Sequence, residues 1–161
     1  METKAREMIE KRLNKLVGQK LIRGYRWQFM PCFVFEDENG GTTELHAYSR
    51  CVISRDNINI LDSDNIVVPC EGVEKEEDDD YGIGDCVFDS QYWEMTEEGL
   101  FPLDVLSAEI KDDGTIRMRL TAGCFFSVIP WRNNQNEAWR IFRPNSDEEH
   151  LVYRGNGTIE Q

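Results

Sequence analysis

From residue 19 onward, apolar and polar side chains alternate along short segments that are separated by turn-forming residues. The clearest case is Ile116, Met118 and Leu120, which alternate with two arginines. A period of two places successive side chains on opposite faces of a strand, so this pattern predicts strands buried on one face. Glycine-containing turns at 37–41 and 111–114 join neighbouring segments as short hairpins do. The alternation therefore predicts a mostly antiparallel sheet of about seven to nine strands.

Two segments replace the alternation with helical spacing. Residues 2–16 repeat apolar side chains along one helical face, and Gly18 follows as a stop. Residues 85–98 have the same spacing, with Asp85 as a candidate N-cap and Gly99 as the end. The predicted fold class is α+β: a mostly antiparallel sheet with an N-terminal helix and one short central helix. We expect a single domain over residues 1–161, in which 66–69 is a further short apolar strand.

The cysteines and tryptophans give expectations about the core. The five cysteines are far apart in the sequence, and no Cys/His cluster with metal-ligand spacing occurs. They are interpreted as free thiols that fill core positions. Trp27 and Trp139 are assigned to the core as well. Trp131 lies between Pro130 and a polar loop and is the ring most expected at the surface, and Trp93 is expected to be partly exposed.

Charge is distributed unevenly along the chain. The net charge is −13. Residues 71–84 include the acidic run 76–80 and are predicted to form a mobile loop. So acidic a chain repels nucleic acid and anionic membranes and attracts basic proteins. With no apolar stretch of about 18 residues and no signal-peptide pattern, the expected location is the cytoplasm.

Two histidines are the candidates for catalytic chemistry in the sequence. His46 lies near Glu44, and His150 follows two glutamates, but a polar strand residue is the simpler interpretation of each. The acidic run lacks the ligand spacing of a calcium loop, so no metal and no cofactor is expected. Whether the chain is an enzyme stays open.

Two stretches carry a resemblance to known proteins. One runs from Glu44 to Asp64, and the other comprises 123–130 and 137–142. Together they resemble small uncharacterised bacterial α+β proteins, some of which are found in polymorphic-toxin immunity loci. The resemblance covers about two thirds of the chain, excludes residues 71–85, and implies no catalytic residues.

Three hypotheses follow from these observations. The leading one is a non-catalytic protein-binding protein, an immunity-type inhibitor of a basic toxin. Its candidate partner-binding residues are Glu76, Glu77, Asp78, Asp79, Asp80, Tyr81, Trp93 and Trp131. The first alternative is an enzyme or small-ligand-binding domain with a site near His46, using Glu44 or Cys51. The second is a self-assembling subunit in which the basic N-terminal helix of one copy pairs with the acidic segment of another.

Overall fold

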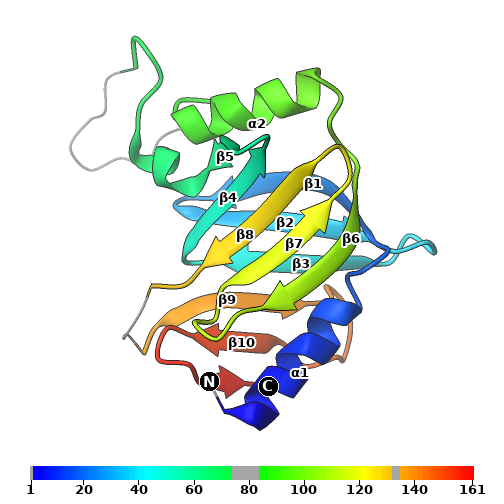
Figure 1. Cartoon of the computed structure of the whole chain (residues 1–161). Coiled ribbons are helices and arrows are strands. Elements are labelled where there is room, and N and C mark those ends of the chain that lie inside the picture. Colours follow the sequence, from blue (N-terminus) through cyan, green and yellow to red (C-terminus); the bar gives the residue numbers. More distant parts are fainter. Residues whose placement is uncertain (1, 74–83, 132–134) are drawn as a thin grey trace.

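The computed structural model describes residues 2–73, 84–131 and 135–161. Within these residues the chain forms two α-helices, a short 3₁₀ helix and eleven strands (Figure 1). In chain order the elements are α1 (Thr3–Asn14), β1 (Lys20–Trp27), β2 (Met30–Glu36), β3 (Thr42–Ala47), β4 (Arg50–Arg55), β5 (Ile58–Asp62), η1 (Ser63–Val67), α2 (Val87–Glu97), β6 (Leu103–Ile110), β7 (Ile116–Leu120), β8 (Cys124–Ile129), β9 (Glu137–Phe142), β10 (Leu151–Arg154) and β11 (Ile159–Glu160).

The strands form one sheet in the order β11-β10-β9-β3-β2-β1-β6-β7-β8-β4-β5, and its neighbours pair antiparallel. β1 pairs with β2 along its length but with β6 only at Lys20 and Leu21, so the sheet folds over there. The layer from β6 to β5 consequently crosses in front of the layer from β1 to β11 (Figure 1). The predicted α+β class is confirmed, but the strand count was too low. A strand as short as β11, with two residues, has no alternation to detect.

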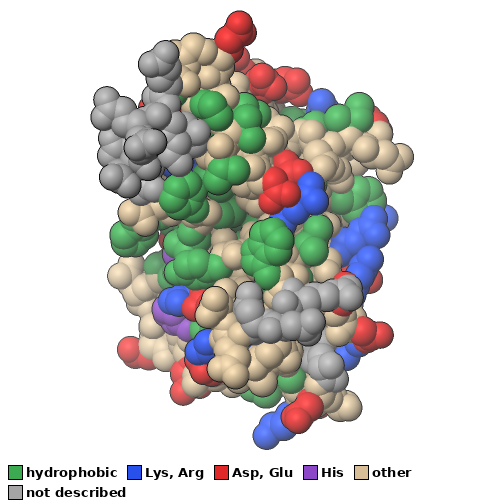
Figure 2. Space-filling view, turned by 90° about the vertical axis from the view of Figure 1, so that its left-hand side faces the viewer, with side chains coloured by type: hydrophobic (Ala, Val, Ile, Leu, Met, Phe, Trp, Pro, Cys, Tyr) green, Lys and Arg blue, Asp and Glu red, His purple; other side chains and the backbone are tan. Residues whose placement is uncertain are grey.

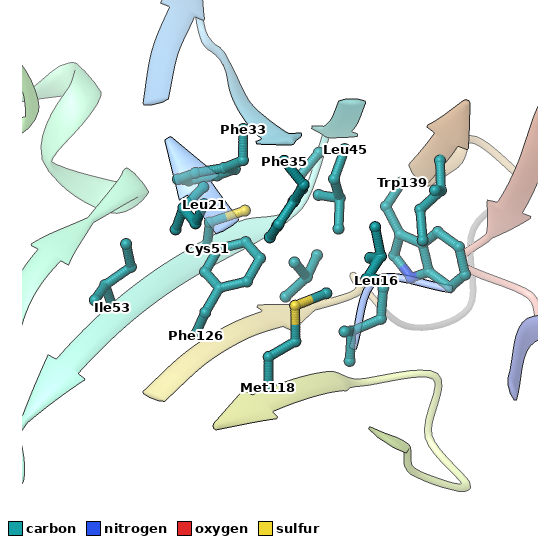
Figure 3. Close-up of a cluster of buried hydrophobic side chains, with 14 of the residues drawn as sticks. Leu16, Leu21, Phe33, Phe35, Leu45, Cys51, Ile53, Met118, Phe126 and Trp139 are labelled. Carbon is teal, nitrogen blue, oxygen red and sulfur yellow. The ribbon is translucent and has the colours of Figure 1, made fainter. Parts of the chain in front are cut away.

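The core lies between the two layers. Phe33 from one layer meets Phe126 from the other with ring centroids 4.6 Å apart, and further apolar side chains from both layers surround this pair (Figure 3). Cys32, Cys51, Cys86 and Cys124 are buried and all five cysteines are free, which confirms four of them as buried thiols. Trp139 is fully buried in the same cluster, as predicted.

Trp27 contradicts its assignment to the core, because its side chain is 69% exposed. The pairing of β1 with β2 shifts by one residue between Leu21 and Arg23, which is a β-bulge. Leu21 and Gly24 therefore face the core, whereas Tyr25 and Trp27 face outward. Since one extra residue reverses the facing of all that follow, the alternation counted from Leu21 gave the wrong side.

The helices cover different parts of the layers. α1 packs against β6, and α2 packs against η1 and β5 (Figure 1). Two local predictions are wrong. Residues 63–67 form η1, where a strand was expected over 66–69, because the Asp62 carboxylate accepts the Asp64 N–H and starts a helical turn. The N-cap of α2 is Cys86, not Asp85, and its side chain makes no capping hydrogen bond.

Candidate functional site

The β1–β2 hairpin ends in an apolar tip. Its two turn residues are Gln28 and Phe29, with Gln28 at φ 53°, and Trp27 and Phe29 are both exposed. Tight hairpin turns ordinarily use Asn, Asp or Gly, which adopt positive φ at low cost and are polar or small. Aromatic rings at this tip contribute nothing to the core. Their position therefore indicates a role at the surface.

Further exposed apolar residues gather beside this tip. Tyr48 lies in the connection from β3 to β4, and Trp131 follows β8 where the chain crosses back to β9. Both chain crossings between the layers thus bring an aromatic ring to the same end of the molecule. We define the aromatic face as Trp27, Phe29, Tyr48, Val67 and Trp131, all of them exposed. Figure 2 shows hydrophobic side chains gathered on this side of the molecule.

Three adjoining hollows mark the aromatic face. Their volumes are about 510, 490 and 390 Å³, and Tyr48 lines all three. Phe29 lines the first and the third, and Trp131 lines the second and the third. We call the first the His46 hollow, and its side chains include those of Trp27, Phe29, His46, Tyr48, Arg140 and Phe142. Aromatic rings form most of the lining of the His46 hollow, and a hollow of this size with such a lining is typical of binding sites.

A hydrogen-bonded group lies behind the wall of the His46 hollow. Glu44 Oε2 accepts from the Tyr25 hydroxyl at 2.9 Å and lies 2.7 Å from His46 Nε2, so the proposed pairing of these two residues is present. Burial, together with the Glu44 hydrogen bond, raises the pKa of Tyr25. The His46 ring stands edge-on to Phe142 with centroids 4.8 Å apart. These contacts hold the His46 ring in one orientation.

The thiols near this site are not available as nucleophiles. Cys32 pairs with His46 across β2 and β3 but is fully buried, and burial raises the pKa of its thiol to about 11. Cys51 lies in the core, and burial raises the pKa of its thiol well above the usual value. A thiol must ionise and be reached by substrate before it can attack. Cys51 is therefore excluded as a surface residue of the alternative site near His46.

Among the described residues, four arginines border the aromatic face, and each contacts a carboxylate. The pairs are Arg26 with Asp89, Arg50 with Asp62 and Asp64, Arg140 with Glu137, and Arg154 with Glu160. Burial raises the pKa of the Asp62 carboxyl, but hydrogen bonds from Arg50 and the Asp64 N–H outweigh burial and leave that pKa below its ordinary value. A phosphate would have to compete with these carboxylates for the guanidinium groups. These four arginines are therefore poorly placed to bind an anion.

The partner-binding residues predicted from the sequence lie in different parts of the chain. Glu76, Glu77, Asp78, Asp79, Asp80 and Tyr81 lie outside the described residues, so their role stays a prediction. The described chain leaves this segment's ends close together, since Cys70 N–H donates to Asp85 O at 2.8 Å. Trp131, 56% exposed, belongs to the aromatic face, as its expected exposure suggested. Trp93 is 54% exposed on α2, but it lines none of the three hollows described above.

Sequence reasoning missed most of this face. Trp27 was placed in the core, and Phe29, Tyr48, Arg140 and Phe142 were not proposed as site residues. One usable signal was Gly24 inside a strand, which commonly marks a bulge. The meeting of the hairpin tip with the two crossings has no local signal, because it depends on how the layers stack.

The basic helix α1 uses several of its cations within the chain. Arg6 contacts Glu10 and Asp112, and Arg12 and Lys15 both contact Glu148. The contacts with Asp112 and Glu148 dock α1 onto the rest of the molecule, whereas Glu10 lies within α1 itself. They leave fewer cations for the pairing between copies that the self-assembly hypothesis requires.

Two structural features are absent from the described residues. No group of three or more His, Cys, Asp or Glu side chains in that part of the chain is placed to hold a metal ion. No helix among them is both long and apolar enough to cross a membrane. In comparisons with known proteins, no family model, curated protein or solved structure matches this chain. The fold and site thus define an α+β protein with two strand layers and an exposed aromatic face.

Proposed function

We propose that this chain is a non-catalytic protein-binding protein whose aromatic face docks a basic protein, in the manner of an immunity-type inhibitor. One observation carries the proposal: an aromatic hairpin tip and two layer crossings bring Trp27, Tyr48 and Trp131 to the surface at one end of the molecule. Contiguous exposed apolar surface of this kind marks interaction sites. Tryptophan, tyrosine and arginine are also the residues favoured at the centres of protein interfaces.

The charge of the chain supports a basic partner. A net charge of −13 attracts cationic proteins over distances up to about 10 Å, the screening length at moderate salt. Attraction of this kind speeds encounter, while burial of aromatic rings slows dissociation. A basic toxin meets both conditions, and the weak resemblance to proteins of immunity loci points the same way.

Site-resolved photo-crosslinking tests this proposal. A photoreactive phenylalanine replaces Tyr48 in one variant and Leu106 in a control, since Leu106 is also exposed but lies on β6. In cells of the native host, we expect the Tyr48 variant alone to capture one partner of net positive charge, with the yield reduced by Trp27→Ala. Equal capture at both positions, no capture at Tyr48, or an acidic partner would count against the proposal.

A small-ligand-binding function is the second candidate, and the His46 hollow favours it. Its volume of about 510 Å³ lies in the range of small-molecule sites, and His46 and Arg140 supply polar groups among aromatic walls. Thermal unfolding in the presence of a panel of small molecules tests this candidate. A ligand that raises the midpoint for the native chain and not for Phe142→Ala would support it, whereas one that acts equally on both would not be bound in this hollow.

A further inference from the structure

The walls of the His46 hollow determine what shape of guest it accepts. Trp27 and Tyr48 present exposed rings, and Phe142 forms a third wall that is held between two histidines. His46 stands edge-on to Phe142, and His150 stacks on it with centroids 4.5 Å apart. A flat or slender group can lie against such rings, whereas a strongly hydrated compact group gains little from them.

The charges around the His46 hollow determine whether it favours a cationic or an anionic group. Counted over the described residues, four arginines that border the aromatic face contact five carboxylates, and Glu44 behind His46 adds a sixth. Arg140 also directs both Nε and Nη2 to Glu137, which occupies the fork that would bind a carboxylate or phosphate. The hollow therefore favours a cation over an anion.

Among cationic groups, a guanidinium fits these walls better than an ammonium. It is planar, weakly hydrated and stacks on aromatic faces, whereas the lysine ammonium is compact and strongly hydrated. The chain itself shows such contacts, with the Arg117 guanidinium 4.9 Å from the Phe125 ring centroid and that of Arg23 5.8 Å from Tyr25. Exposed aromatic rings attract cations of this type through the negative face of the ring.

We infer that the His46 hollow receives an arginine side chain of the basic partner, with its guanidinium stacked between Trp27 and Tyr48. This inference rests on the proposed function and specifies the partner's contact residue. An arginine held in this way would also be drawn to the acidic excess behind the rings. It would anchor the partner at the centre of the aromatic face.

Titration with a capped amino acid tests the inference. Nα-acetyl-arginine amide imitates an arginine inside a partner chain, and Nα-acetyl-citrulline amide has nearly the same shape without the charge. Followed by NMR at the tryptophan indole N–H groups, the arginine probe should give a saturable shift at Trp27. The citrulline probe should bind about tenfold more weakly, because it lacks the cation–π attraction. Free arginine, whose own carboxylate meets the acidic surroundings, should also bind more weakly than the capped probe.

Matched variants keep the result specific. Trp27→Ala should abolish the saturable shift of the remaining signals, whereas Trp93→Ala, which removes a ring of similar exposure outside the hollows, should leave the affinity unchanged. Equal binding of the citrulline probe, no saturable shift, or equal loss in both variants would overturn the inference. Tighter binding of free arginine would identify a small-molecule site instead. Failure of these probes beside successful crosslinking at Tyr48 would refute the arginine guest while leaving the docking surface intact.

Discussion

Trp27 and Trp139 lie on strands of the same layer but in opposite environments, one at the surface and one in the core. Trp139 on β9 is fully buried, stacks on Tyr153 with centroids 4.9 Å apart, and donates from Nε1 to Gly114 O at 3.3 Å. Trp27 on β1 is 69% exposed beside a hairpin tip. The turn between β6 and β7 covers Trp139, which donates to the Gly114 carbonyl. Among the described residues no hairpin turn covers Trp27 in this way, so the comparison is between a ring packed in the core and a ring at the surface.

The largest effect on the free energy of unfolding is expected at Trp139. Trp139→Ala should lower the free energy of unfolding by about 4 kcal/mol, because it removes a fully buried indole and leaves a cavity. Urea denaturation followed by circular dichroism measures this loss, and the protein concentration is varied to exclude association. A loss of unfolding free energy below about 1 kcal/mol would show that the stability of the fold does not depend on the packing of Trp139.

The second-largest effect on stability is expected at the ion pair between Arg26 on β1 and Asp89 on α2. Arg26 Nη2 and Asp89 Oδ2 lie 2.9 Å apart and both side chains are largely buried. Burial raises the pKa of Asp89, but hydrogen bonds from Arg26 and the Gly84 N–H outweigh burial and leave the pKa below its ordinary value. Asp89→Asn should therefore lower the free energy of unfolding by about 3 kcal/mol at pH 7, since Arg26 loses its counter-charge.

The sign of this shift fixes the pH dependence. A carboxyl with a lowered folded-state pKa contributes stability above its unfolded pKa, about 3.9, and loses that contribution as the pH falls through the folded value. The difference between the native chain and Asp89→Asn should thus be constant from pH 7 to 5 and shrink below about pH 3.9. Urea titrations across this range measure it, and a gap that does not change with pH would contradict the pairing.

A smaller effect is expected at the turn that closes over Trp139. A Cβ added to Gly114 would lie 2.1 Å from the Tyr153 hydroxyl oxygen, and the backbone there has φ 83°. Gly114→Ala should cost about 2 kcal/mol, from backbone strain and displacement of Tyr153. Gly123→Ala is the matched control, since it has φ 68° and nothing within 4 Å of the added Cβ. If both variants lose the same stability, strain alone explains Gly114 and the contact contributes nothing.

The smallest effect on the free energy of unfolding is expected at Trp27. Trp27→Ala should change the free energy of unfolding by no more than about 0.5 kcal/mol, because the ring is largely in water in the folded state. The same denaturation experiment provides the measurement. A loss comparable to that of Trp139→Ala would show that Trp27 is a structural residue and would remove the contrast between the two tryptophans.

Much of the local structure could be predicted from the sequence. The period-two alternation at Ile116, Met118 and Leu120 predicted β7 correctly, and Gly99 marked the end of α2 near Glu98. The exposure of Trp131 was foreseen because its neighbours are a proline and a polar loop. These features depend on nearby residues, so a linear pattern contains the relevant information. The strand expected over 66–69 was wrong because the Asp62 carboxylate accepts the Asp64 N–H, and the helical turn over 63–67 prevailed over the β-propensity of Ile66 and Val67.

The sequence by itself determined the class of fold, the acidic charge and the use of buried cysteines as core residues. Only the tertiary structure decided which aromatic rings are exposed and which of them meet. One bulge in β1 reversed the facing of Trp27, and the stacking of two layers brought Phe29, Tyr48 and Trp131 together from three separate connections. Periodicity describes one strand at a time. A surface assembled from several connections depends on register and on the crossing of layers, which are set by long-range packing.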